Sequence, residues 1–170
     1  MTSPLDNGNR WAVLGVSVFF LTLGTLIAAR TPAVALVNES PSVPRGLYLR
    51  QPGAAPARGA MVALPQPALA RRYLGALGMP GEVLLIKRVA AVGGDRVCRH
   101  GAVVRTPGRV VPVLDRDRRG AVLPGWTGCR RLAADELFLL GDTPGSFDSR
   151  YFGPVRTRDL EGVFRETLTW

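Results

Sequence analysis

Three residue types that often carry chemistry are scarce in this sequence, which holds one lysine, one histidine and two cysteines. The single histidine, His100, falls in an expected turn, and no G-x-S-x-G elbow is present. Both facts argue against a Ser-His-Asp triad, although His100 stays an alternative general base. The cysteines, Cys98 and Cys129, are too few and too far apart for a common zinc pattern, and no second histidine completes one. We therefore expect no metal and no cofactor.

The two cysteines have another use if the domain lies outside the reducing cytosol. Cys98 and Cys129 would then form a disulfide that closes a loop of about 30 residues and adds about 3 kcal/mol to stability. The alternative is two separate buried thiols, and the sequence does not decide between them.

The scarcity of lysine makes Lys87 conspicuous, because it is the only lysine among 22 lysine and arginine residues. Arginine stays protonated at any working pH, whereas a desolvated lysine can lose its proton. Lys87 is therefore a candidate for a neutral catalytic amine. The alternative is a lysine on a solvated strand face, and only a partner nucleophile separates the two.

The formal net charge of +9 does not by itself predict a nucleic-acid partner. The arginines are scattered without a run longer than two and without interleaved aromatic residues, so no groove-lining pattern emerges. The 14 prolines and 20 glycines favour turns and short strands over long helices. We expect one mainly β domain and no nucleic-acid binding.

A stretch without charges near the start of the chain predicts a membrane anchor. After a polar tail at 1–10, residues 11–29 carry no charge, and this length suffices to span a bilayer core as a helix. The predicted organisation is a tail at 1–10, a transmembrane anchor at 11–30 and a catalytic domain at 31–170. A cleaved signal peptide is the alternative, since Ala33-Val34-Ala35 has the small-x-small pattern of a cleavage site.

Several segments of the remaining chain have strand or helix patterns. The Val37–Arg50 stretch has loop and strand signals, and Lys87 lies within the apolar run that starts at Val83. A short helix is expected at Leu69–Leu77. The other predicted strands are Ala60–Leu64, Val83–Val92, Arg96–Cys98, Ala102–Arg105, Arg109–Leu114 and Glu136–Leu140.

Ser40 and Ser42 lie about ten residues beyond the predicted anchor, in a proline-rich stretch. Pro41 and Pro44 restrain the backbone to extended conformations and so fix the direction of the Ser42 side chain. A serine hydroxyl needs a base, and Lys87 in apolar surroundings can serve in place of histidine. Ser42 and Lys87 therefore form a candidate pair.

A polar segment, GDTPGSFDSRYFGPV at 141–155, follows the last predicted strand. Such a loop after a strand is typical of a site. Ser146 or Asp142 could bind and orient the lysine amine, and Asp148 could pair with Arg150 to hold the loop rigid. The alternative is an ordinary turn with a surface salt bridge.

Together these segments resemble the type I signal peptidase family (S26), most closely its conjugative-transfer branch, the TraF-type peptidases that process pilin precursors. The family motifs are S-x-S-x-P, then K-R-V with a later G-D, then G-D followed by S-x-D-S-R-x-x-G. This chain has Ser40-Pro41-Ser42-Val43-Pro44, Lys87-Arg88-Val89 with Gly94-Asp95, and Gly141-Asp142 with the stretch from Ser146 to Gly153.

The resemblance implies a role for each motif residue. Ser42 would be the nucleophile and Lys87 the general base, Ser40 would donate to the oxyanion, and Ser146 would orient Lys87. Supporting roles fall to Asp142, Asp148 and Arg150.

The resemblance also implies the fold, the location and the substrate. It implies one N-terminal transmembrane helix and an antiparallel β catalytic domain on the outer face of the cytoplasmic membrane, acting on a pilin-like exported precursor. The alternatives are a general signal peptidase and a membrane-tethered binding protein of the same fold without catalysis. A self-cleaving regulatory protease is disfavoured, because the first 36 residues hold a membrane segment rather than a DNA-binding domain.

Overall fold

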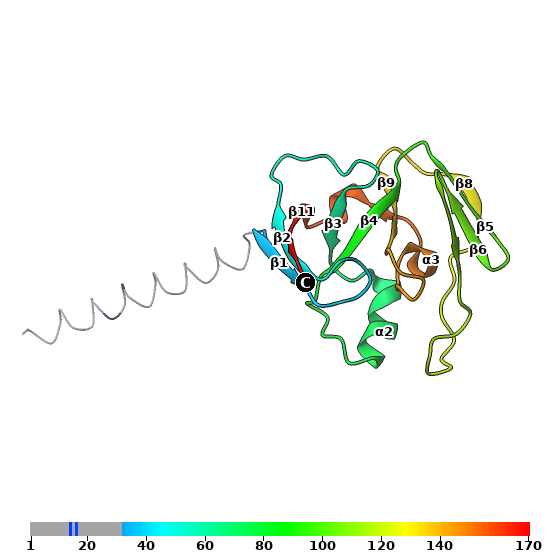
Figure 1. The fold of residues 1–170 in the computed structure, drawn as a ribbon, viewed down its shortest axis with the longest axis horizontal. Helices are drawn as coiled ribbons and strands as arrows, with labels where there is room; N and C mark the ends of the chain where they lie inside the picture. Colours follow the sequence, from blue (N-terminus) through cyan, green and yellow to red (C-terminus); the bar gives the residue numbers. More distant parts are fainter. Residues whose placement is uncertain (1–13, 15, 17–31) are drawn as a thin grey trace, which may run out of the picture. The chain divides into compact units, whose positions relative to one another are not determined.

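The computed structural model describes residues 14, 16 and 32–170, and Ala33–Trp170 form one compact unit (Figure 1). Among these described residues, no helix is both long and apolar enough to cross a membrane. The predicted tail at 1–10 lies outside the described residues, and so does the predicted anchor at 11–30 apart from Leu14 and Val16.

The larger of two sheets has seven strands in the order β1-β2-β11-β3-β4-β9-β10. Every neighbouring pair is antiparallel, which confirms the predicted mainly β fold with antiparallel pairing. The strands are β1 (Ala35–Asn38), β2 (Gly46–Arg50), β3 (Met61–Leu64), β4 (Leu85–Ala91), β9 (Glu136–Leu140), β10 (Val155–Arg156) and β11 (Gly162–Thr169).

The smaller sheet has four antiparallel strands in the order β7-β6-β5-β8. Its strands are β5 (Arg96–His100), β6 (Val103–Thr106), β7 (Arg109–Pro112) and β8 (Cys129–Arg131). Cys98 of β5 lies opposite Cys129 of β8, and the two form a disulfide. The described helices are α2 (Ala68–Ala76), the short α3 (Ser149–Phe152) and a 3-10 turn, η1 (Thr157–Asp159).

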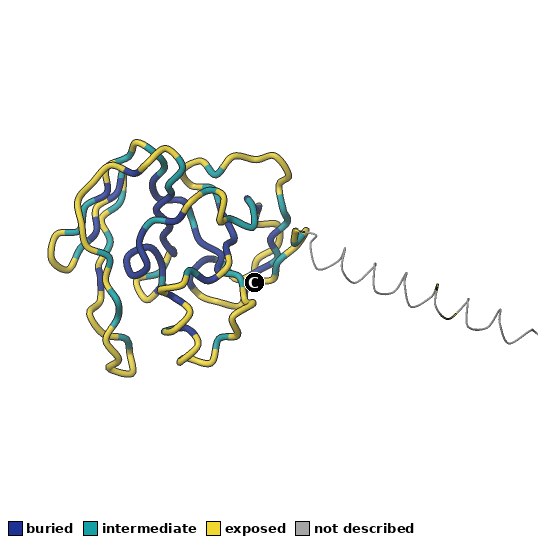
Figure 2. Tube along the Cα trace, turned by 180° about the vertical axis from the view of Figure 1, so that it is seen from behind, coloured by how far each residue is buried: buried dark blue, intermediate teal, exposed yellow. Residues whose placement is uncertain are grey.

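Strand β4 shows how the sheet places the lysine. Successive strand residues point to opposite faces, so Lys87 shares a face with Leu85 and Val89. Both leucine and valine belong to the apolar cluster that contains Leu74 of α2 and Phe152 of α3. Lys87 therefore enters the interior on the face that the helices cover, and Figure 2 shows the buried chain at the centre of the domain.

Most predicted elements are confirmed to within two residues at each end. The helix is found at Ala68–Ala76, and Glu136–Leu140 is found unchanged as β9. The prediction for His100 was wrong, because this residue is the last of β5 and not part of a turn.

Three strands have no counterpart in the sequence analysis. They are β8, β10 and β11, and β11 lies inside the larger sheet between β2 and β3. The side chains of β11 are exposed after Phe164. The sequence there needs no alternation of apolar and polar residues, which is the pattern that identifies a half-buried strand.

Candidate active site: a buried serine and lysine

The turn that carries Ser42, residues 39–45 between β1 and β2, is held by a side chain that the sequence analysis missed. The Asn38 amide donates to the carbonyl oxygens of Ser40, Val43 and Pro44 at 2.9, 3.1 and 2.9 Å. Its own oxygen accepts from the Ser40 amide at 3.1 Å. One buried side chain thus satisfies four backbone groups, and nothing in the local sequence pattern signals this role.

Tyr48 of β2 holds the same turn from the other side. Its hydroxyl donates to the Pro44 carbonyl at 2.6 Å. Burial is the main cause that raises the Tyr48 pKa to about 12. The phenol therefore stays protonated and remains a donor at any working pH.

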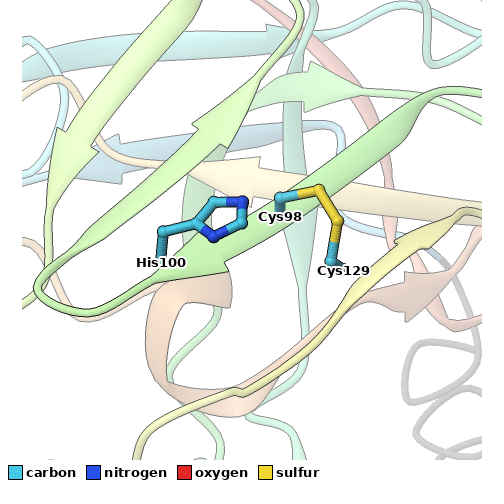
Figure 3. A group of neighbouring side chains, drawn as sticks. All are labelled: Cys98, His100 and Cys129. Carbon is cyan, nitrogen blue, oxygen red and sulfur yellow. A yellow bond between two sulfur atoms is a disulfide. The ribbon is translucent and has the colours of Figure 1, made fainter.

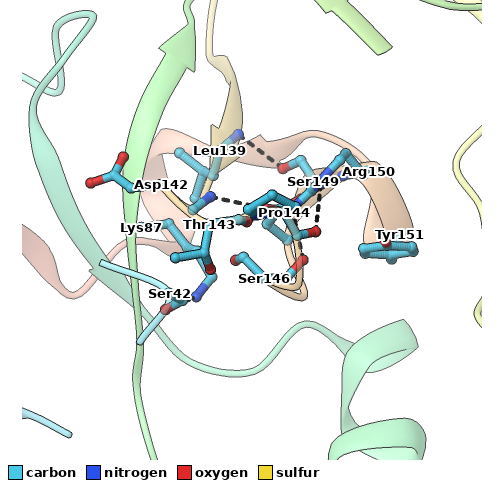
Figure 4. A network of polar contacts seen from close by, with 12 residues as sticks. Ser42, Lys87, Leu139, Asp142, Thr143, Pro144, Ser146, Ser149, Arg150 and Tyr151 are labelled. Carbon is cyan, nitrogen blue, oxygen red and sulfur yellow. Dashed lines mark hydrogen bonds and ion pairs between the residues drawn. The ribbon is translucent and has the colours of Figure 1, made fainter. Parts of the chain in front are cut away.

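Ser42 and Lys87, 45 residues apart in the sequence, meet in the interior (Figure 4). Lys87 Nζ donates to Ser42 Oγ at 2.9 Å, and the two residues are only 4% and 6% exposed. This is the nucleophile–base separation that acyl transfer needs. If the amine is neutral, the direction of the bond can reverse, and the serine hydroxyl then donates to nitrogen.

The surroundings of Lys87 make the neutral amine easier to form than in a lysine exposed to water. Desolvation is the largest cause that lowers its pKa from 10.5 to about 8, and the positive charge of Arg150 lowers it further. The negative charges of Asp148 and Asp142 act against this shift. At pH 7 about one lysine in ten would then be neutral.

Ser40 connects the buried serine to the surface. Its hydroxyl donates to Ser42 Oγ at 3.0 Å, and the same oxygen accepts from the Ser42 amide at 3.2 Å. Ser40 is itself exposed. The structure therefore brings Ser40, Ser42 and Lys87 into one hydrogen-bonded chain that opens at Ser40.

Asp148 and Arg150 anchor the site loop, residues 141–148. Asp148 is fully buried and accepts two side-chain bonds from Arg150 at 2.8 Å, and it also accepts from the Gly141 amide at 2.8 Å. Arg150 is 1% exposed and donates to loop carbonyls of Pro144 and Ser146 at 3.0 and 2.8 Å. The predicted pair is thus a buried network that holds the loop, and not a surface salt bridge.

A neighbouring serine, Ser149, was not singled out from the sequence. Its hydroxyl accepts from the backbone amide of Leu139 at 2.9 Å, and both groups are buried. This bond ties the first residue of α3 to β9, so the site loop is fixed at both ends. A serine at this position carries no signal that sets it apart from the other serines of the loop.

Ser146 lies close to the site, but no bond from it to the lysine is present. Its hydroxyl oxygen is buried and has no hydrogen-bond partner among residues 32–170. Gly141 explains the close packing here, since a Cβ at this position would collide with the Ser146 side chain and lie 2.8 Å from the Ser42 carbonyl oxygen. Glycine is therefore needed at the end of β9 for Ser42 and the site loop to approach each other.

Asp142 was predicted to hydrogen-bond Lys87, but it holds the Ser42 turn through other contacts. Its amide donates to the Ser42 carbonyl at 2.6 Å, while its carboxylate accepts two bonds from Arg88 at 3.0 and 2.8 Å. Arg88, through this hydrogen bond, is the first cause that lowers the Asp142 pKa. Arg109 of β7 lies 3.9 Å from the same carboxylate. Asp142 thus joins the Ser42 turn to β4 and to the smaller sheet.

Metal-ligand residue types gather elsewhere in the described part of the chain. Cys98, His100 and Cys129 bring their ligand atoms within 4.8 Å of one another on the smaller sheet. The Ser42 site instead pairs a serine with a lysine whose pKa is lowered by burial, which suits proton transfer.

Comparisons with known proteins identify the family of this chain. The family model described as "Signal peptidase, peptidase S26" matches residues 9–170. The plasmid transfer protein TraF of Escherichia coli is 35% identical over 158 residues, which cover 85% of this chain and 89% of that protein. A probable conjugal transfer protein TraF of Sinorhizobium fredii is 32% identical, covering 93% of this chain and 89% of that protein.

A solved signal peptidase I from Enterococcus faecalis V583 is more distant. It superposes with a TM-score of 0.39 at 23% identity, covering 65% of this chain and 97% of that chain. The family model and the sequence relatives, each spanning most of the chain, confirm the predicted resemblance: this chain belongs to the signal peptidase family, peptidase S26.

Proposed function

We propose that this chain is a membrane-bound serine endopeptidase that cleaves signal-peptide-like segments of exported precursors with a Ser42/Lys87 dyad. The observation that carries the proposal is the buried 2.9 Å contact between Lys87 Nζ and Ser42 Oγ. A lysine whose pKa lies near 8 can act as a base near neutral pH, which an arginine cannot.

Each chemical step has a residue to perform it. Neutral Lys87 takes the Ser42 proton as Ser42 Oγ attacks the scissile carbonyl carbon, and the resulting ammonium gives that proton to the leaving amine. The acyl group then rests on Ser42 Oγ. Water, or an amine of the substrate itself, releases it with Lys87 acting again as base.

Ser40 has two tasks in this proposal. In the resting site the Ser40 hydroxyl oxygen accepts the hydrogen bond of the Ser42 amide. That amide is a natural donor to the oxyanion. An incoming carbonyl oxygen would take that place, and the Ser40 hydroxyl, released from its bond to Ser42 Oγ, would become a second donor to it.

The proposed location and substrate follow from the family and the names of the relatives. We place residues 11–30 in the cytoplasmic membrane as an uncleaved anchor and residues 31–170 on its outer face. The relatives are named for plasmid or conjugal transfer, so we propose a pilin-like precursor as the substrate. Enzyme and precursor in one bilayer would have a raised effective concentration.

Co-expression with a pilin-type precursor tests the dyad. We expect cleavage with the full wild-type chain and none with Ser42→Ala or with Lys87→Arg, which keeps the charge but cannot become neutral. Thr167→Ala, an exposed hydroxyl on β11, is the matched control and should cut normally. Normal cutting by Lys87→Arg would assign lysine a structural role and contradict the dyad.

The pH profile gives a second test of the same base. The value of kcat/KM should rise with pH as Lys87 loses its proton and level off above about 8. A profile that is flat from pH 6 to 9 would contradict lysine as the base.

A catalytically silent binding protein of the same fold is the second candidate, and one observation favours it. Ser42 is 6% exposed and its amide is occupied by Ser40, as expected of a closed site. An active-site acylating probe separates the candidates, since labelling of Ser42 requires a working nucleophile.

A general signal peptidase would instead cleave unrelated secretory precursors as well as the pilin-type one.

A further inference from the structure

The smaller sheet gathers three metal-ligand side chains that play no part in the proposed peptidase chemistry. Cys98 and His100 are two residues apart on β5, so their side chains share one face of the sheet. Cys129 of β8 lies directly opposite Cys98, which places its side chain on that face too. Figure 3 shows the imidazole beside the disulfide.

The ligand atoms of these three residues already lie within 4.8 Å of one another. Tetrahedral zinc with bonds of about 2.3 Å to sulfur holds two thiolates roughly 3.8 Å apart, with a histidine nitrogen at a similar distance. Opening of the disulfide therefore requires only side-chain rotation, because the strand pairing that brings the cysteines together is made by the backbone.

We infer that the reduced form of this sheet binds one zinc-like divalent cation through Cys98, Cys129 and His100, with water in the fourth position. A dithiol or phosphine reductant supplies two electrons, and the two sulfurs take up two protons as the disulfide opens. Metal binding then releases those two protons and leaves two thiolates on the ion. The ion would join β5 to β8 where the disulfide joins them in the oxidised chain.

The surroundings suit thiolate ligands. Arg96, two residues before Cys98, donates to Cys129 Sγ at 3.5 Å, and such outer contacts orient and stabilise a metal-bound sulfur. Arg131 lies opposite Arg96, and Arg105 lies opposite Cys98, so the site has positive neighbours. The two thiolates offset the charge of a divalent cation, and the arginines then face a neutral complex.

The position is open to solution. His100 and Cys129 are exposed and Cys98 is half-buried. A reductant and a hydrated cation can both reach it without unfolding of the domain.

Cobalt is the probe for the test, because its thiolate complexes absorb in the near ultraviolet and its visible bands report four-coordination. The full chain in detergent is reduced with a phosphine and titrated with Co²⁺, and Zn²⁺ is then added. We expect one equivalent of Co²⁺ per reduced chain, displaced by Zn²⁺, and no such bands for the oxidised chain. His100→Ala should weaken binding by at least about tenfold.

Controls decide whether these three residues are the site. Arg158→Ala removes an exposed arginine outside the smaller sheet, so it should keep the bands and the stoichiometry. The Cys98→Ser/Cys129→Ser chain should show no bands. If reduction unfolds the domain, Zn²⁺ should restore its resistance to protease. Absence of stoichiometric binding, unchanged affinity in His100→Ala, or failure of Zn²⁺ to restore an unfolded reduced chain would each overturn the inference.

Discussion

The larger and the smaller sheet both hold a cluster of reactive side chains, but the cluster is buried in the larger sheet and exposed on the smaller one. Around the Ser42 site, Lys87, Asp148 and Arg150 are each at most 4% exposed, and the carboxylate and guanidinium have hydrogen-bond partners. On the smaller sheet, His100 and Cys129 face solvent. Burial changes the chemistry of a group, as the lowered pKa of Lys87 shows, while exposure leaves a group reachable by solutes.

The largest effect is expected from the buried ion pair. Arg150→Met leaves the Asp148 carboxylate buried without its partner, so the free energy of unfolding should fall by about 3–5 kcal/mol in urea titrations. Arg156→Met is the matched control, since Arg156 also pairs with an aspartate, Asp135, but on the surface. Its unfolding midpoint should hardly move. Equal losses for the two variants would remove the distinction between the buried and the exposed pair.

The disulfide should affect stability without affecting chemistry. Replacing Cys98 and Cys129 by serine lifts the constraint on the unfolded chain, and the free energy of unfolding should fall by about 3 kcal/mol. The precursor-cleavage rate should stay unchanged at a temperature where both proteins are folded, because the cysteines join β5 to β8 and not the site loop. A lost rate in a folded variant would mean that the two sheets are coupled more tightly than their contacts suggest.

Lys87 should lower stability while it enables catalysis. Its folded pKa of about 8 lies below 10.5, so the folded chain holds fewer protons than the unfolded chain between these values, and stability rises with pH across that window. Methionine does not titrate, so Lys87→Met avoids this cost. The variant should be inactive, and its free energy of unfolding at pH 7 should exceed that of wild type by up to about 3 kcal/mol. The gain should shrink as the pH rises toward 10.5. A variant less stable than wild type at pH 7 would show that the lysine contacts outweigh its desolvation.

Asp142 should have the smallest effect on stability. Its side chain and that of Arg88 are each about one-third exposed, at 32% and 33%, so Asp142→Asn should lower the free energy of unfolding by about 1 kcal/mol or less. The loss should vanish in acid, where the native carboxylate is also protonated. A loss as large as that of Arg150→Met would place Asp142 in the buried network instead of at its edge.

The outline of the fold could be predicted from the sequence because much of it is locally encoded. The apolar run at Glu136–Leu140 and the helix pattern near Leu69 need no distant partner to be recognised. Strand β11 could not be recognised in this way. Its hydrogen bonds to β2 and β3 hold it in the sheet, while most of its side chains remain in solvent.

The residues of the candidate site also fall into two groups, those that could be predicted from the sequence and those that could not. Lys87 was identifiable because it is the only lysine, and Ser42 because prolines flank its motif. Asn38 was not, since its four bonds join backbone groups whose positions depend on the folded turn. The predicted hydrogen bonds of Ser146 and Asp142 to Lys87 are absent from the described part of the chain. The Ser146 hydroxyl is buried without a partner. The Asp142 carboxylate instead accepts two hydrogen bonds from Arg88.

The sequence by itself determined which residue types are available: one amine that can be neutral, a serine in a restrained turn, and a polar loop after an apolar strand. Only the tertiary structure decided how they meet. It turned Lys87 into the interior beside Ser42, and it brought Cys129 across from Cys98 beside His100. Both contacts join segments far apart in the chain, and such contacts are set by strand pairing and burial, which no local pattern encodes.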